Sequence, residues 1–203
     1  MPIAITIEPP VAVPQQPPRK KWTRDECLFL ERSGLFDGQK YELVDGELIN
    51  KMAMDRPHVV SIVLTTAWLS EVFEATRVQA QGPINVAPED NPTSLPQPDL
   101  CVLSCSARDL DLDHPAPTDV VLVIEVADSS FDFDSTTKAG LYARAGIGDY
   151  WILDVRGRRI VVHREPHGGR YTSVTSFGEH EQAYPLAAPG SGVTAGELLA
   201  RGA

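Results

Sequence analysis

The sequence predicts one domain of the α/β or α+β class, built on a mixed β-sheet. Three observations predict it. Segments with helical and with strand periodicity follow one another in the order helix, hairpin, helix, strands, helix, strands. The chain has 203 residues, enough for one full-sized core. No internal repeat or linker divides residues 22–203, whereas the Pro-rich residues 1–21 are expected to form an extended, disordered arm.

The first half is predicted to contain a short helix, a hairpin and a long helix. Thr23 and Glu26 have the spacing of a capping box and open the short helix. Asp45-Gly46 stands between two alternating runs, which is a strong hairpin signal. Pro57 then leads into a helix that ends near residue 75. Its expected apolar face consists of Val59, Ile62, Val63, Thr66, Leu69, Val72 and Phe73.

The second half is predicted to supply the sheet. Strands are expected over 77–81, 84–87, 99–103, 120–127, 149–155, 159–164 and 171–175. Residues 132–145 predict a helix that Gly146 closes, and residues 194–199 a final helical turn.

The charge distribution indicates that the central part of the chain attracts cations rather than nucleic acid. The formal net charge is -10, and residues 88–134 carry 11 acidic side chains against one basic side chain, Arg108. Such a field attracts divalent cations and repels phosphates. A bound nucleic acid is therefore expected at the basic clusters, which are Arg19, Lys20 and Lys21 near the start and Arg156, Arg158, Arg159, Arg164 and Arg170 near the end.

Composition also bears on location. No apolar run reaches the roughly 18 residues that span a bilayer, so no membrane partner is expected. Three cysteines form an odd set without a CxxC pair. A reduced, cytoplasmic setting is the simplest interpretation.

Two acidic residues on apolar strands are the main functional signal. Asp99 stands at the start of a strand after Pro98, and Glu125 interrupts the apolar run 120–127. A buried unpaired carboxylate costs several kcal/mol, so such groups are usually neutralised, paired or bound to a metal. With Lys138 in the next helical segment, they indicate a divalent-cation site for phosphodiester chemistry. The alternatives are a turn role for Asp99, a structural ion pair for Glu125 and an exposed helix position for Lys138.

Five segments resemble, in order, the Uma2 family of restriction-endonuclease-like proteins of bacteria. They are residues 41–48, 98–100, 124–130, 138–147 and 149–154, and the resemblance spans about residues 23–164. It implies a PD-(D/E)xK nuclease fold over residues 22–203, with a mixed central sheet flanked by helices and a metal site at the edge of the sheet.

The resemblance also implies roles for individual residues. Asp99 matches the PD aspartate and Glu125 the acidic residue of the next core strand. The lysine that the general pattern places two residues later is replaced by Ala127, and the resemblance places a compensating lysine at Lys138. We expect Asp99, Glu125 and the carbonyl oxygen of Val126 to hold Mg²⁺ or Mn²⁺ with waters. Lys138 would orient the attacking water or stabilise charge on the phosphate.

Four further residues are secondary candidates. Glu42 and Glu47 are possible additional acids, although a solvated position is expected for both. His58 could reach a phosphate from the start of the long helix, with a capping or surface role as the alternative. Gln97, beside the PD pair, could steer the scissile phosphate.

The leading functional hypothesis is a metal-dependent DNA endonuclease. One alternative is a catalytically degenerate binding or regulatory module, because Ala127 replaces the expected lysine. Another is a nuclease that acts on RNA or single strands. A homodimer is expected, because the implied fold resembles that of nucleases that cut the two strands of DNA with two active sites.

Overall fold

A six-stranded mixed sheet forms the centre of the molecule. The computed structural model describes residues 18–51, 55–110 and 113–201. The strands lie in the order β3-β4-β5-β6-β7-β8, with β5 and β6 parallel and the other neighbours antiparallel. Their bounds are β3 Val78–Ala80, β4 Leu100–Leu103, β5 Val120–Ala127, β6 Asp149–Asp154, β7 Arg159–His167 and β8 Arg170–Phe177. This architecture confirms the predicted mixed α/β fold.

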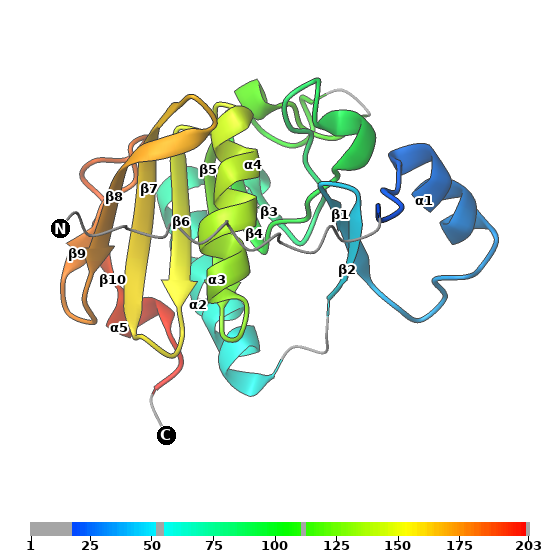
Figure 1. Ribbon diagram of the computed structural model, residues 1–203. Helices are drawn as coiled ribbons and strands as arrows, with labels where there is room; N and C mark the ends of the chain where they lie inside the picture. The colour runs from blue at the N-terminus through cyan, green and yellow to red at the C-terminus, as the bar shows by residue number, and fades with distance from the viewer. Residues whose placement is uncertain (1–17, 52–54, 111–112, 202–203) are drawn as a thin grey trace, which may run out of the picture.

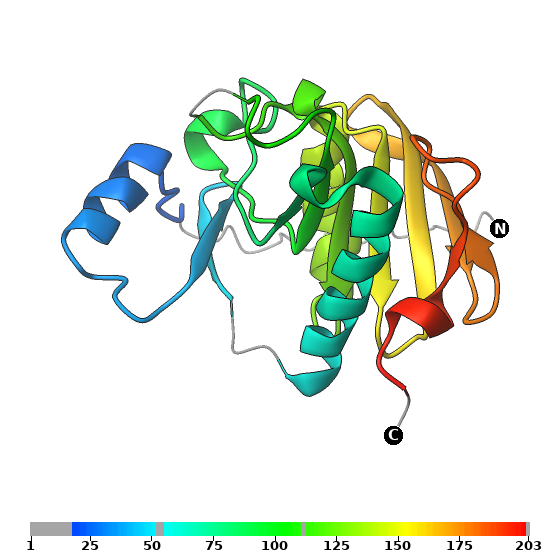
Figure 2. The same ribbon diagram turned by 180° about the vertical axis from the view of Figure 1, so that it is seen from behind.

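Helices cover both faces of this sheet. One face carries α2 (Arg56–Phe73) and α5 (Ala195–Leu198), and the other carries one long helical segment (Figures 1 and 2). This segment consists of α3 (Phe131–Phe133), a π-helical turn η4 (Asp134–Lys138) and α4 (Ala139–Arg144). It connects β5 to β6, because parallel neighbours need a crossover connection.

The alternation of side chains along β5 separates two cores. Leu122, Ile124 and Val126 belong to the core under α2 and α5. Val123 and Ala127 belong to the core under α4. Successive side chains point to opposite faces of a strand, so Glu125, between Val126 and Ile124, faces the α4 side.

An N-terminal unit extends beyond the main sheet. It contains α1 (Arg24–Arg32) and a separate hairpin of β1 (Tyr41–Val44) and β2 (Glu47–Asn50), and α1 lies on the far side of the hairpin from the sheet (Figures 1 and 2). The Arg24 guanidinium anchors α1 by donating to Ser94 O at 2.6 Å and to the side chains of Asn85 and Asn91, both at 2.7 Å.

The remaining elements are short. They are the 3₁₀ turns η1 (Ala75–Arg77), η2 (Asn91–Thr93) and η3 (Pro117–Asp119), and the paired strands β9 (Gln182–Ala183) and β10 (Val193–Thr194). No helix in the described ranges is long and apolar enough to cross a membrane.

Several predictions about elements need correction. Residues 84–87 form no strand, because Ile84 N–H donates to Pro96 O and Asn85 N–H to Pro115 O, both outside the ladder. The fully buried residues of α2 are Ser61, Thr65, Leu69 and Phe73. Of the expected face, Ile62 and Val72 are partly buried against the core, whereas Val63 is 60% exposed. The strands β9 and β10 were not predicted. The prediction of an N-terminal arm falls mostly on residues 1–17, outside the described residues, and 18–21 have no helix or strand.

Candidate active site

Asp99 and Glu125 lie side by side on adjacent antiparallel strands. Leu100 pairs with Ile124, so the same register sets Asp99 opposite Glu125. The Val126 N–H donates to Asp99 Oδ2 at 2.9 Å, and the Asp99 N–H to Glu125 Oε2 at 3.4 Å. Both side chains are buried, with 6% and 2% of the two residues exposed. Like charges directly opposite one another destabilise a sheet, so this pair calls for a nearby cation.

Lys138 supplies positive charge from the covering helix. Its Nζ lies 2.9 Å from Glu125 Oε1, 2.9 Å from Glu42 Oε1 and 3.9 Å from Asp134 Oδ1. The residue is 3% exposed, which excludes the alternative of an exposed helix lysine. Ala127, two residues after Glu125, faces the same core, and the helix over that core brings Lys138 to the acid.

Two residues of this helix were missed from the sequence. Tyr142 donates its hydroxyl to Glu125 Oε1 at 2.8 Å, and Asp134 accepts from Ser130 Oγ at 2.6 Å while lying beside Lys138. Positions 134, 138 and 142 are four residues apart, so they share a helix face. That spacing is the signal that could have identified them.

The hairpin contributes Glu42. This residue is 4% exposed, so the expectation of a solvated position is wrong for it and correct for the exposed Glu47. Glu42 Oε2 accepts from Gln97 N–H at 3.1 Å, and the Gln97 side chain donates to Tyr41 O at 3.2 Å. Gln97 therefore ties the hairpin to the segment before Asp99.

Two basic side chains flank Asp99. His58 Nε2 lies 3.6 Å from Asp99 Oδ2, and this buried nitrogen has no hydrogen-bond partner among the described residues. Lys51, which the sequence did not identify, donates to Gln97 O and places Nζ 4.0 Å from Asp99 Oδ1. Asp55 caps α2 by accepting the His58 N–H at 3.1 Å, which fixes the start of the helix beside the site.

The surroundings shift the pKa values of the buried acids in opposite directions. Burial raises the pKa of Glu125 to about 8, with the charge of Lys138 opposing the rise. Burial likewise raises the pKa of Asp134 to about 6. Burial also acts on Asp99, but the neighbouring His58 imidazole and the charge of Lys51 outweigh it and hold the pKa of Asp99 below its ordinary value. For Lys138, burial is outweighed by Glu125 and Glu42, which raise its pKa.

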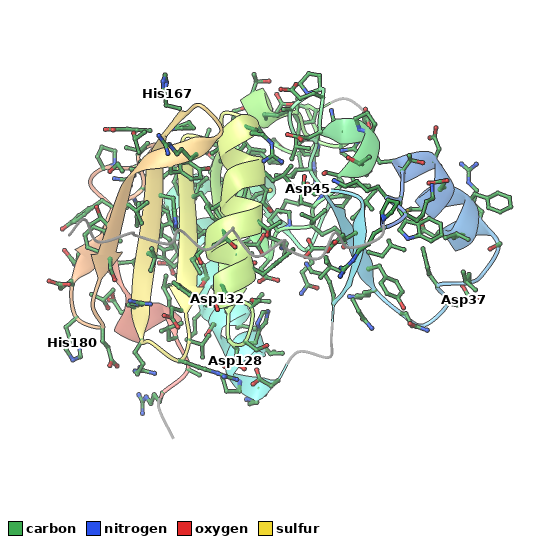
Figure 3. All side chains as sticks on the ribbon, in the orientation of Figure 1. Asp37, Asp45, Asp128, Asp132, His167 and His180 are labelled. Atoms are coloured by element: carbon green, nitrogen blue, oxygen red, sulfur yellow. The ribbon has the colours of Figure 1, made fainter. Side chains whose placement is uncertain are left out.

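The acids and the basic residues beside them line a cleft of about 1060 Å³ that extends along the hairpin and α1. They are Glu42, Lys51, His58, Asp99, Glu125, Asp134 and Lys138. Its lining also includes Lys40, His114 and Arg156. Of the side chains labelled in Figure 3, Asp128 belongs to the lining of this cleft, whereas His167, at the tip of the β7–β8 hairpin, and His180 lie at the periphery. The candidate site therefore lies in a cleft beside the hairpin, with its acidic side chains buried, rather than on an exposed surface.

The C-terminal arginines expected to hold nucleic acid have mostly acidic partners. Four are ion-paired: Arg156 with Asp128, Arg158 with Glu179, Arg159 with Asp154 and Arg164 with Asp149. Their charge is therefore largely neutralised within the fold, and of this group only Arg156 lines the cleft.

The donor set suits a hydrated cation rather than a complete protein cage. Within the described ranges, no three His, Cys, Asp or Glu side chains are placed to hold a metal ion together. Mg²⁺ usually keeps several waters and binds one or two carboxylates plus substrate phosphates. The two buried carboxylates of Asp99 and Glu125 agree with that arrangement.

Comparison with known proteins identifies the family. The family model Uma2, described as "Putative restriction endonuclease", matches residues 26–196. The chain belongs to the Uma2 family. Restriction-endonuclease-like enzymes generally use divalent metals, and membership indicates a nuclease-like function and nucleic-acid binding for this Uma2 protein.

A solved structure has the same fold as this Uma2 protein. It is a crystal structure described as "a putative nuclease belonging to DUF820" from Anabaena variabilis. The two share 16% sequence identity with a TM-score of 0.66, over 87% of this chain and 96% of that chain. No curated protein matches the chain.

Proposed function

We propose that this Uma2 protein is a divalent-cation-dependent nuclease that hydrolyses phosphodiester bonds in DNA. The arrangement of three side chains carries the proposal. Asp99 and Glu125 are opposite one another at one end of β4 and β5, and Lys138 lies 2.9 Å from Glu125. Two acids and a lysine, buried at a cleft, are the groups that metal-assisted hydrolysis needs.

The local charge balance supports a cation requirement. Three buried carboxylates, those of Glu42, Glu125 and Asp134, lie around the buried ammonium of Lys138, and the buried Asp99 is opposite Glu125 on the next strand. Lys51, which lies 4.0 Å from Asp99, compensates one more charge. A divalent cation held by Asp99, Glu125 and the Val126 carbonyl oxygen would offset the remaining negative charge, and it would displace the proton that the raised pKa of Glu125 leaves on that acid when no cation is bound. Mg²⁺ and Mn²⁺ are the ions that such oxygen donors favour.

The side chains around this position would have distinct roles. When bound, the cation would polarise a phosphoryl oxygen and lower the pKa of a bound water. Lys138 would orient the attacking water and stabilise negative charge on the phosphate. His58 and Lys51, beside Asp99, would contact phosphate oxygens from the rim. Glu42 and Gln97 would hold Lys138 and the hairpin in place.

DNA is the proposed substrate, because the family is described as a restriction endonuclease, and basic residues that can contact phosphates line the same cleft as the acids. Lys40 and Lys51 lie along it, although the acidic surroundings oppose tight binding of phosphates. Binding is therefore expected to depend strongly on the divalent cation.

Plasmid cleavage tests this proposal. Purified protein is incubated with supercoiled plasmid and Mg²⁺ or Mn²⁺, beside Asp99→Ala, Lys138→Ala and the matched control Asp109→Ala, whose acid is exposed and outside the cleft. We expect metal-dependent nicking by the wild type and the control, and none by the other two variants. Equal nicking by all four proteins would contradict the assigned site.

Two outcomes support the alternatives instead. Preferential cleavage of RNA or single-stranded DNA would replace the proposed substrate. No cleavage of any nucleic acid, together with no measurable Mn²⁺ binding, would indicate a degenerate binding or regulatory module.

Three further expectations belong to the same proposal. They are a single nuclease-like domain over 22–203, a homodimer and a cytoplasmic location. Light scattering tests the dimer, and a monomer at micromolar concentration would count against it.

A further inference from the structure

The two carboxylate oxygens of Glu125 have different surroundings. Oε1 accepts two strong hydrogen bonds, from Lys138 Nζ at 2.9 Å and from the Tyr142 hydroxyl at 2.8 Å. Oε2 has one long contact in the described part of the chain, from the Asp99 N–H at 3.4 Å. Oε2 is therefore the oxygen that remains available to a ligand, and it lies on the side of Asp99.

The two donors to Oε1 are not equivalent. Lys138 is shared, because its Nζ also lies 2.9 Å from Glu42 Oε1 and 3.9 Å from Asp134 Oδ1. The Tyr142 hydroxyl, in contrast, donates to Glu125 alone among the described residues. Its ring is fully buried and packs edge-on against Tyr150 with a centroid distance of 5.0 Å, so this donor has a fixed position.

We propose that Tyr142 is a positioning residue that holds the Glu125 carboxylate with Oε2 directed towards Asp99 for cation binding. This inference rests on the proposed metal-dependent function. In that reaction Lys138 is needed at the water and the phosphate, and the Tyr142 hydroxyl keeps Glu125 oriented while the lysine is engaged. Outer-shell partners that orient metal ligands typically contribute 10–100-fold to metal affinity.

Tyr142→Phe, with Tyr171→Phe as its control, tests the inference. Phe keeps the ring and removes only the donor to Glu125. Tyr171 stacks on Tyr150 in the same aromatic cluster, but its hydroxyl donates to Ile147 O at 2.9 Å, away from the acids. Both substitutions therefore remove a tyrosine hydroxyl from one cluster, and only one of them removes a contact to Glu125.

The measured quantity is the affinity of the full chain for Mn²⁺. The protein is titrated with Mn²⁺, and electron paramagnetic resonance reports the concentration of free Mn²⁺ at each step. We expect Tyr142→Phe to weaken Mn²⁺ binding by about 10–100-fold. Tyr171→Phe should stay within about twofold of the wild type, which separates loss of orientation from general loosening of the cluster. Nicking by Tyr142→Phe should recover in excess Mn²⁺, because the defect is one of affinity.

Each other outcome overturns the inference. Unchanged Mn²⁺ affinity in folded Tyr142→Phe would reduce Tyr142 to a packing residue, while leaving the proposed nuclease intact. Equal losses in the two Phe variants would assign the effect to the aromatic cluster. A wild type that binds no Mn²⁺ would overturn both the inference and the proposed function. If circular dichroism shows that Tyr142→Phe does not fold, Tyr142→Met, which fills the space without a donor, carries the same expectations.

Discussion

Nζ of Lys138 lies 2.9 Å from Oε1 of Glu125, and the lysine comes from the helix that covers the acid rather than from the strand that carries it. Side chains two residues apart on a strand share a face, so position 127 would deliver a lysine to the same place. Ala127 leaves that space to the helix, and the π-helical turn over Asp134–Lys138 ends at the lysine itself. Turns of this kind are frequent at functional sites.

Removing the Lys138 charge is predicted to destabilise the fold. In Lys138→Met, Glu125 and Glu42 lose their shared buried partner, and loss of one partner of a buried pair costs about 3–5 kcal/mol. Urea denaturation at neutral pH without divalent cations measures the change. Lys20→Met is the control, because the Lys20–Glu26 pair is exposed and solvent screens it. Equal shifts in the two variants would contradict a special role for the buried pair.

Divalent cations are predicted to stabilise the folded protein. A ligand that binds only the native state at 100 times its dissociation constant adds about 2.7 kcal/mol to the free energy of unfolding. We therefore expect Mn²⁺ to raise the thermal midpoint of the wild type and of Asp109→Ala, and to leave that of Asp99→Ala unchanged. A midpoint that rises in all three proteins would place the cation elsewhere.

Acid is predicted to destabilise the protein through His163. This histidine is buried beside Tyr150, and burial lowers its pKa below the ordinary value near 6.5. The unfolded chain then takes up the proton first, so the contribution is fully present above pH 6.5 and is lost as pH falls through the lower folded-state value.

His163→Phe tests this prediction, because it keeps a ring in the cluster and removes the titrating group. Unfolding free energies between pH 7.5 and pH 5 should fall less steeply for His163→Phe than for the wild type. His167→Gln, at the hairpin tip, leaves the buried imidazole in place and should follow the wild type (Figure 3). Identical slopes for His163→Phe and the wild type would refute the prediction.

Arg24 is predicted to hold α1 against the rest of the protein. Its guanidinium makes three hydrogen bonds to the loop that contains Asn85 and Ser94, whereas no residue of α1 is fully buried. In Arg24→Ala, amide hydrogen exchange should accelerate by at least about tenfold across 24–32 and stay unchanged in β5. Arg32→Ala, at the other end of α1, should leave exchange near the wild-type rate. Protected α1 amides in Arg24→Ala would show that other contacts anchor the helix.

Local patterns sufficed for much of this protein. The capping box at Thr23, the Asp45-Gly46 hairpin and the apolar strand 120–127 depend on neighbouring residues, and all three are present. The pattern failed at 84–87, where the buried Ile84 and Val86 mimic a strand while the backbone bonds to loops. A buried segment that pairs with no strand has the same apolar sequence pattern as a true strand.

The sequence by itself determined the mixed fold and the family resemblance, and it predicted Asp99, Glu125 and Lys138 as the candidate site. Only the tertiary structure decided that Glu42 is buried at Lys138, that Tyr142 and Lys51 join the site, and that most C-terminal arginines are neutralised. The physical reason is that periodicity and turn chemistry act between neighbours in the chain. Which polar groups meet depends instead on strand register and helix packing, which bring together residues that are far apart in the sequence.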